Sequence, residues 1–216
     1  MQRLVLVDGT ALAYRAYFAI PANLQTSSGI ATNASFGFAT MFRKIFAGRK
    51  PDFGAVIFDA PGRTFREEKL GSYKQSREAM PDPLSQQLPW IHRLVDAFRF
   101  PRIEFPGYEA DDVIGTLTRR AIASGLEVLI ISGDKDFCQL ISERVRMLDA
   151  MRDITYDPEL VRKKWGVPPS MFVDLLALLG DKIDDIPGVR ASGRRAPPSS
   201  FIATRISMGS TRSSTS

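Results

Sequence analysis

The sequence is poor in the side chains on which many enzyme sites depend. Its 216 residues include one cysteine, Cys138, and one histidine, His92. A single cysteine forms no internal disulfide, and this pair cannot supply the ligands of a zinc finger. The same scarcity argues against Cys-His nucleophiles and Ser-His-Asp triads. We interpret His92, which lies in a helical pattern, as a structural residue.

The sequence also lacks a long apolar run. No stretch approaches the roughly 18 uninterrupted apolar residues of a membrane helix, and the amino terminus shows no signal-peptide pattern. Hydrophobic residues nevertheless make up 44% of the chain, which is enough to build the core of a sizeable domain. We therefore expect a soluble cytoplasmic protein that is a monomer and has no membrane partner.

Most of the chain has no surplus of either charge. The formal net charge is +5, but residues 190–216 hold five arginines and neither an acid nor a lysine. Residues 1–189 therefore carry 24 basic and 24 acidic groups. These charges are segregated, with acids where strands are expected to end and bases concentrated between Arg63 and Arg77. Such local segregation matters more to a ligand than the sum.

Apolar runs alternate with helical patterns along the chain. We predict strands at 3–8, 53–59, 102–105, 127–132 and 145–149, and helices near 10–19, 34–48, 83–99, 110–124, 136–142, 158–165 and 170–179. This alternation predicts an α/β fold with a mainly parallel central sheet that helices cover on both faces.

Carboxylates follow the expected strands and converge in the predicted fold, because residues just past the carboxyl ends of parallel strands meet at one crevice. Two carboxylates about 4 Å apart repel by roughly 4 kcal/mol at an effective dielectric near 20, so such a set needs divalent cations to stay ionised. Ligation by oxygen alone favours magnesium or manganese over zinc. The predicted metal site comprises Asp8, Asp59, Glu109, Asp111, Asp112, Asp134, Asp136, Asp181 and Asp184.

Two of these assignments have simpler alternatives. Glu109, Asp111 and Asp112 begin a predicted helix, where the helix dipole favours acids, so they are also candidate capping residues. The basic and aromatic segment 63–77 is expected to be helical, with Lys74 and Arg77 beside Tyr73 on a surface that grips phosphates and stacks bases. A solvated surface helix is the alternative for that segment.

Other classes with acids at strand ends fit less well. A haloacid-dehalogenase-like phosphatase needs a second Asp two residues after the first, where this chain reads Asp8-Gly9-Thr10. A response-regulator receiver needs a paired acid at the first strand and a lysine at the end of the last, and neither is evident.

The motifs resemble, in chain order, the 5′-nuclease domain of bacterial DNA polymerase I, within the wider flap endonuclease family. The resemblance spans residues 1–189, and the combination is specific although each motif is short. The matching runs are Val5-Leu6-Val7-Asp8-Gly9, Tyr14-Arg15, Phe58-Asp59, Phe65-Arg66, Tyr73-Lys74, Tyr108-Glu109-Ala110-Asp111-Asp112, Ser132-Gly133-Asp134-Lys135-Asp136 and Leu179-Gly180-Asp181-Lys182-Ile183-Asp184-Asp185-Ile186-Pro187-Gly188-Val189.

The resemblance implies a PIN-like 5′-nuclease core with a helical arch at about 63–82. The implied activity is that of a 5′-3′ exonuclease and structure-selective flap endonuclease, which hydrolyses DNA phosphodiesters in replication and repair. Its implied partners are DNA with 5′ flaps, nicks or RNA–DNA junctions, and a DNA polymerase. A catalytically weak DNA-binding remnant and a PIN-type RNase are the alternatives.

The resemblance also implies roles for individual residues. The acids would hold two Mg²⁺ ions, with Mn²⁺ able to substitute. Lys74 and Arg77 would steer and polarise the phosphate, as catalytic and DNA-binding residues, and Arg15, Arg66 and Tyr73 would bind DNA. After Val189 the family's glycine hairpin, part of a helix-hairpin-helix, is replaced by a basic Ser/Arg/Pro-rich stretch at 190–216. We expect this stretch to be a disordered tail that reflects a shifted reading frame or a truncation, with a genuine short basic tail as the alternative.

Overall fold

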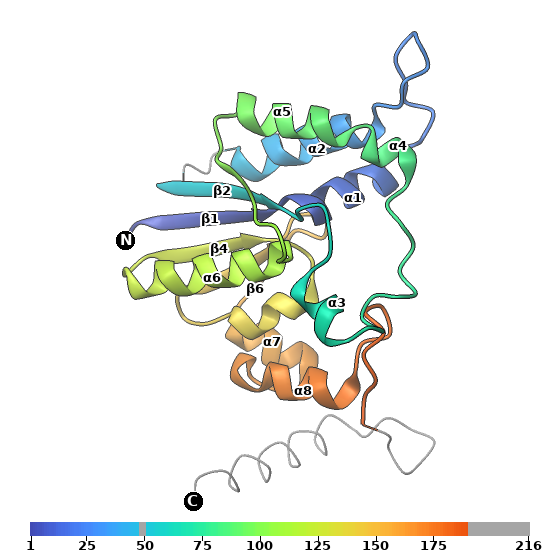
Figure 1. The fold of residues 1–216 in the computed structure, drawn as a ribbon. Coiled ribbons are helices and arrows are strands. Elements are labelled where there is room, and N and C mark those ends of the chain that lie inside the picture. Colours follow the sequence, from blue (N-terminus) through green and yellow to red (C-terminus); the bar gives the residue numbers. More distant parts are fainter. Residues whose placement is uncertain (48–50, 190–216) are drawn as a thin grey trace, which may run out of the picture.

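A parallel sheet forms the centre of the molecule. The computed structural model describes residues 1–47 and 51–189 (Figure 1). Within these residues, six strands form one sheet in the order β3-β2-β1-β4-β5-β6. All neighbours pair in parallel except β5 and β6, which are antiparallel. The strands are β1 (Arg3–Asp8), β2 (Phe53–Phe58), β3 (Arg102–Glu104), β4 (Glu127–Ile131), β5 (Val145–Asp149) and β6 (Ile154–Tyr156).

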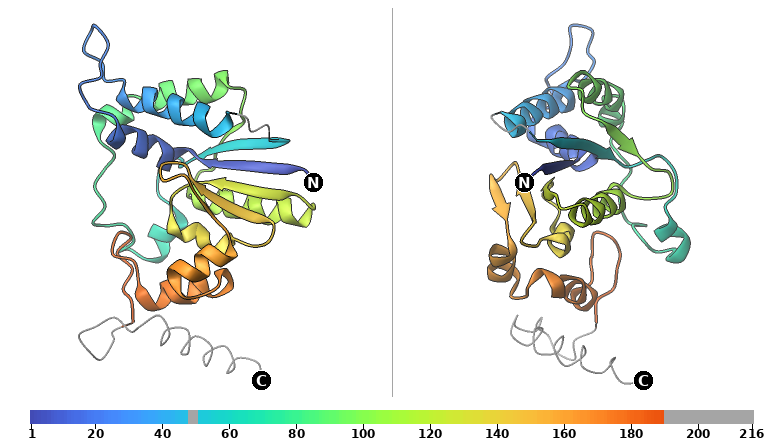
Figure 2. Two further views of the ribbon diagram at one scale, coloured as in Figure 1. Left: turned by 180° about the vertical axis from the view of Figure 1, so that it is seen from behind. Right: turned by 90° about the vertical axis from the view of Figure 1, so that its left-hand side faces the viewer.

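Helices cover both faces of this sheet (Figures 1 and 2). One face carries α1 (Gly9–Ala19), α2 (Asn33–Phe46), α4 (Asp82–Ser85) and α5 (Leu88–Ala97), and the other carries α6 (Ala110–Ala123), η1 (Lys135–Leu140), α7 (Pro158–Trp165), η2 (Pro169–Met171) and α8 (Phe172–Leu179). The expected α/β architecture is therefore confirmed. None of the helices in the described part of the chain has the length and apolar character needed to cross a bilayer.

The two cores follow from the alternation of side chains along the strands. In β1, Leu6 packs with Ile114 of α6, whereas Val5 and Val7 pack on the opposite face with Phe38 of α2. All five side chains are almost fully buried. Both faces of the strand are therefore apolar, which is why it reads as a continuous hydrophobic run that stops at an acid.

Glycine at position 9 permits a close approach between α1 and the sheet. A Cβ atom there would lie 2.7 Å from the ring of Phe58 and 2.8 Å from Val56. Helix α1 begins directly after Asp8 because no side chain separates it from β2 at this point. This tight connection fixes the carboxylate of Asp8 at the end of the sheet.

The structure differs from the expected elements in several places. The helix expected through 63–77 covers only α3 (Phe65–Lys69), and turns follow it to residue 76. The helix expected at 136–142 is the 3₁₀ helix η1, and the short antiparallel strand β6 was not predicted. The tail expected at 190–216 lies outside the described residues.

Candidate active site

Asp8 lies at the carboxyl end of β1 and is buried. One carboxylate oxygen accepts a hydrogen bond from the backbone N–H of Ala11, 2.9 Å away, and so caps helix α1. The other accepts from the hydroxyl of Ser132, also at 2.9 Å. That hydroxyl in turn accepts from the backbone N–H of Asp134 at 3.1 Å. Ser132 therefore connects the acid that ends β1 to the acid that follows β4.

Asp59 and Asp134 follow β2 and β4 and are more exposed than Asp8. The Asp59 carboxylate accepts from the backbone N–H of Ala110 at 2.7 Å, which ties the end of β2 to the first turn of α6. Asp134 caps η1 by accepting from the N–H of Asp136 at 2.9 Å. Asp111, in the first turn of α6, is the fourth acid of this group.

Burial and the charges of neighbouring acids shift the titration of two members of this group, Asp8 and Asp111. Burial raises the pKa of Asp8 from 3.8 to about 6, and the charges of Asp59 and Asp134 add to the rise. For Asp111, burial followed by the charges of Asp8, Asp134 and Asp59 raises the pKa to about 8. The acids of β1, β2, β4 and α6 thus share one electrostatic environment at the carboxyl end of the sheet. We call Asp8, Asp59, Asp111 and Asp134 the central acids.

Asp136 adjoins the central acids. Burial, and then the charge of Asp134, raises its pKa from 3.8 to about 6. Its Oδ1 is buried and accepts no hydrogen bond from a described residue, and the ammonium group of Lys135 lies 3.8 Å from it. A buried carboxylate oxygen without a donor is costly unless a cation reaches it.

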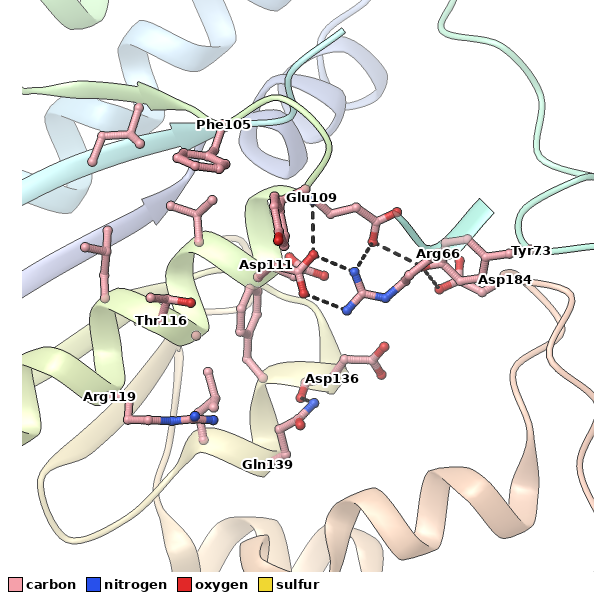
Figure 3. Close-up of a pocket in the computed structure, with 18 of the residues that line it drawn as sticks. Arg66, Tyr73, Phe105, Glu109, Asp111, Thr116, Arg119, Asp136, Gln139 and Asp184 are labelled. Atoms are coloured by element: carbon pink, nitrogen blue, oxygen red, sulfur yellow. Dashed lines mark hydrogen bonds and ion pairs between the residues drawn. The ribbon is translucent and has the colours of Figure 1, made fainter. Parts of the chain in front are cut away.

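A second group of acids is already paired with the basic segment (Figure 3). Glu109 accepts hydrogen bonds from the Tyr73 hydroxyl at 3.0 Å and from the Lys74 ammonium at 2.8 Å. Asp184 lies within 4.0 Å of the same ammonium group. The backbone N–H of Lys74 also donates to the carbonyl of Asp184, so the segment after α3 is docked on the 181–186 loop.

Asp112 is held by different partners. Arg66 donates through both Nη atoms to the two carboxylate oxygens, at 2.5 and 2.7 Å, in a bidentate pair that also fixes the orientation of the guanidinium (Figure 3). The same carboxylate accepts from the backbone N–H of Glu109 at 3.1 Å. The capping interpretation therefore describes Asp112, whose oxygens are already engaged by a helix start and an arginine.

The 181–186 loop brings the last two predicted acids to the site. Asp181 forms an ion pair with Lys135 and accepts from the backbone N–H of Ile183. The adjacent Asp185 accepts from the backbone N–H and the hydroxyl of Ser76, at 2.7 and 2.8 Å. Asp181 and Asp184 thus reach the site on a loop that is fastened to η1 and to the segment after α3.

The fit of divalent cations depends on how these acids are arranged. Among residues 1–47 and 51–189, no three Asp, Glu, His or Cys side chains are close enough to hold one ion in this conformation. Three acids outside the central four form ion pairs with bases instead: Asp112 with Arg66, Glu109 with Lys74 and Asp181 with Lys135. The central acids nonetheless offer only oxygen donors, burial and neighbouring acids raise the pKa values of Asp8 and Asp111, and Asp136 has a buried oxygen that accepts no hydrogen bond from a described residue. These features fit a hard divalent cation such as Mg²⁺ or Mn²⁺.

The predicted bases have unequal access to a ligand. Arg15 does not face the crevice freely, because it donates to the fully buried Asp149 at 2.8 Å. Tyr73 is buried rather than lying on an exposed helical surface beside Lys74 and Arg77, which corrects the expectation for this segment. Arg77 is exposed. Burial raises the pKa values of Tyr14 and Asp184, and the nearby charge of Arg77 offsets part of each rise.

Two contributors to the site were not predicted from the sequence. Ser132 lies in the Ser132-Gly133-Asp134 run, but the pattern does not reveal that its hydroxyl contacts both Asp8 and Asp134. Asp149 ends β5 in the same way that Asp8 ends β1, so its place after a strand was an available signal. Arg15, which pairs with Asp149, also lies against Gly133: a Cβ atom at position 133 would be 1.5 Å from Arg15 Nη2.

Comparison with known proteins agrees with this geometry. Residues 3–166 match the family model for the 5′-3′ exonuclease, N-terminal resolvase-like domain. The chain belongs to this 5′-3′ exonuclease family. It is 46% identical over 198 residues to DNA polymerase I of Bacillus caldotenax, covering 90% of this chain and 22% of the polymerase. It is 42% identical over 193 residues to the 5′-3′ exonuclease of Aquifex aeolicus (strain VF5), covering 89% and 66%.

Solved structures of the exonuclease fold are similar as well. The bacteriophage T5 D15 protein co-crystallised with metal ions superposes with a TM-score of 0.71 at 22% identity, covering 96% of this chain and 75% of that one. The T5 D15 flap endonuclease in a pseudo-enzyme-product complex with DNA and metal ions gives 0.74 at 21% identity, with the same coverage. These likenesses confirm the predicted 5′-nuclease fold. The chain spans about a fifth of the length of the polymerases that it matches and about two thirds of the Aquifex exonuclease.

Proposed function

We propose that this chain is a divalent-metal-dependent 5′-3′ exonuclease and flap endonuclease acting on DNA. The observation that carries the proposal is the shared environment of the central acids, where burial and mutual repulsion raise the pKa of Asp111 to about 8. Such a cluster is unfavourable by itself and becomes favourable when it surrounds cations. The family match supports nuclease chemistry and does not favour a PIN-type RNase or an inactive remnant.

The proposed ligand set consists of the central acids together with Glu109, Asp136, Asp181 and Asp184. Asp112 is left out because Arg66 and the start of α6 already engage its oxygens. Two Mg²⁺ ions, or Mn²⁺ in their place, would supply an activated water and neutralise charge on the scissile phosphate. Glu109 and Asp181 would exchange their present contacts with Lys74 and Lys135 for those ions.

Basic side chains of the protein would offset the repulsion between a phosphodiester and the carboxylates of the crevice. Lys74 lies 2.8 Å from Glu109, so its ammonium group is already at the rim of the site and would contact the phosphate once that acid turns to a cation. Arg77 is exposed beside it and is free to form a charge-assisted hydrogen bond to a phosphate oxygen. Arg66 would act indirectly, by holding the first turn of α6 that carries Asp111.

Substrate choice and cellular context extend this proposal. DNA with 5′ flaps, nicks or RNA–DNA junctions is the expected substrate, a DNA polymerase is the expected partner, and the cytoplasm is the expected location. The likeness to a polymerase-linked domain and to a DNA-bound flap endonuclease fold supports these points.

A substrate panel tests the proposal. Purified protein is mixed in Mg²⁺ with end-labelled 5′-flap DNA, 3′-flap DNA, blunt duplex and an RNA of the 5′-flap sequence. We expect cleavage near the junction of the 5′-flap DNA and little cleavage of the 3′-flap or blunt duplex. Preferential cutting of RNA would instead support the RNase reading, and a folded protein that cuts none of the four would contradict the proposal.

A further inference from the structure

A groove of about 930 Å³ leads from the central acids along the outer face of α6. Asp111 and Glu109 lie at one end, and Arg119 lies at the other (Figure 3); Arg120, the next residue of α6, also lines the groove. Arg119 lies ten positions after Glu109 along the helix, which corresponds to roughly 15 Å along the axis. The groove therefore begins among the proposed ligands, since Asp136 and Asp184 also line it, and its Arg119 end lies well beyond them.

One wall of this groove contains an exposed cluster of aromatic rings. The ring centroids of Phe105 and Tyr108 are 5.5 Å apart, and those of Phe65 and Tyr108 are 5.3 Å apart. Phe105 is 55% exposed and Tyr108 45% exposed, although large rings are costly to leave in water. Phe65 adjoins the groove residue Arg66, whose guanidinium lies 4.7 Å from its ring. The cluster presents flat apolar faces in a fixed arrangement.

Positive charge borders the aromatic cluster. The Lys69 ammonium lies 5.4 Å from the centre of the Phe65 ring, on the α3 side. Arg119 and Arg120 are exposed on α6, and neither forms an ion pair with another residue of the described part of the chain. Cations with no acidic partner beside exposed rings are complementary to a chain of phosphates and unpaired bases.

We propose that this groove binds the unpaired 5′ strand of the DNA beyond the scissile phosphate. The inference rests on the proposed function, because that reaction places a phosphate at the acids and leaves a single strand to continue from it. Base faces in an intact duplex are stacked on each other and cannot cover Phe105 and Tyr108, whereas an unpaired base can. An apolar peptide would leave Lys69, Arg119 and Arg120 without partners.

Two groove variants and two matched controls test the assignment. Phe105→Ala removes an exposed ring, and Phe53→Ala removes a ring of similar exposure from the amino-terminal end of β2, away from the site. The double variant Arg119→Ala/Arg120→Ala removes two charges from α6, and Arg43→Ala/Lys44→Ala removes two from the end of α2 on the other face. Melting curves establish that each variant is folded.

Binding is measured with a fluorescein-labelled single-stranded DNA of about ten nucleotides, in EDTA, by anisotropy. We expect each groove variant to weaken binding at least about fivefold, the smallest effect of losing one base–aromatic stack, while both controls bind like the wild type. Equal affinity in groove and control variants would overturn the proposal. Because no cleavage is needed, this result is obtained whether or not the protein proves to be a nuclease.

Cleavage assays then distinguish a role in binding the strand in the groove from a role in the cleavage site. On a long 5′ flap, the groove variants should lose at least about fivefold in kcat/KM, and on a nicked duplex without a flap they should match the wild type. An equal loss on both substrates would assign these residues to the cleavage site and contradict the proposal. Groove-dependent DNA binding by a wild type that cuts no substrate would refute the proposed function while the groove assignment stands.

Discussion

Replacing Asp111 by asparagine is expected to stabilise the folded protein when divalent cations are absent. Burial and the charges of Asp8, Asp134 and Asp59 raise the pKa of Asp111 from 3.8 to about 8. A carboxylate whose pKa is raised on folding is ionised more easily in the unfolded chain, so its ionisation favours unfolding. Asparagine keeps the shape of the side chain and removes the charge.

The size of the effect follows from the pKa difference. The cost begins above the unfolded value of 3.8, grows by about 1.4 kcal/mol per pH unit, and levels off near the folded value of about 8. At pH 7 this corresponds to about 4 kcal/mol, which rearrangement and water entry reduce, so we expect a gain of about 2 to 4 kcal/mol. For a chain of this length the melting temperature should rise by about 5 to 15 °C.

The assay is thermal unfolding of the wild type and Asp111→Asn in EDTA between pH 5 and pH 8. The advantage of the variant should grow as the pH rises and shrink when Mg²⁺ saturates the wild type. Asp153→Asn is the control, because Asp153 is exposed and its positive φ of 53° suits asparagine. If Asp111→Asn is destabilised in EDTA at pH 7, or its advantage does not depend on pH, the reasoning from mutual repulsion is wrong.

Two further substitutions test residues that hold acids at the carboxyl end of the sheet in place. Ser132→Ala should weaken Mn²⁺ binding, measured by calorimetry, and should lower kcat more than it changes KM, because Asp8 and Asp134 lose the hydroxyl that connects them. Ser132→Thr keeps that hydroxyl and should restore both Mn²⁺ binding and kcat. Arg15→Ala should cost about 2 to 4 kcal/mol in urea unfolding, since the buried Asp149 would keep only the exposed Arg152 guanidinium, 3.4 Å away, and backbone N–H donors. A loss of DNA affinity without loss of stability would restore Arg15 as a DNA contact.

The sheet was predictable because each buried strand is an apolar run that ends at an acid. Parallel strands bring their carboxyl ends together, so the approach of Asp8, Asp59 and Asp134 followed from strand order alone. Strand β6 has three residues and no such run, and it forms because β5 offers an edge for antiparallel pairing. Its pairing partner, not its own sequence, decides its structure.

The basic segment shows where local patterns fail. Helical spacing placed Tyr73 beside Lys74 and Arg77, but α3 ends at Lys69 and the chain turns so that Tyr73 is buried against Glu109. Arg15 likewise belongs to a partner 134 residues away. Long-range contacts override local periodicity in the basic segment. For Arg15 they set the partner of a residue on a helix that periodicity predicted correctly, and no local spacing encodes them.

The most direct test of the account is cleavage of a 5′-end-labelled flap duplex by the wild type in Mg²⁺, beside Asp111→Asn in Mg²⁺ and the wild type in EDTA. The account predicts a product cut near the flap junction in the first reaction only, with the variant still folded and still binding the flap. Cleavage that persists at the same rate in Asp111→Asn or in EDTA would contradict the assignment of the central acids as a metal-dependent nuclease site.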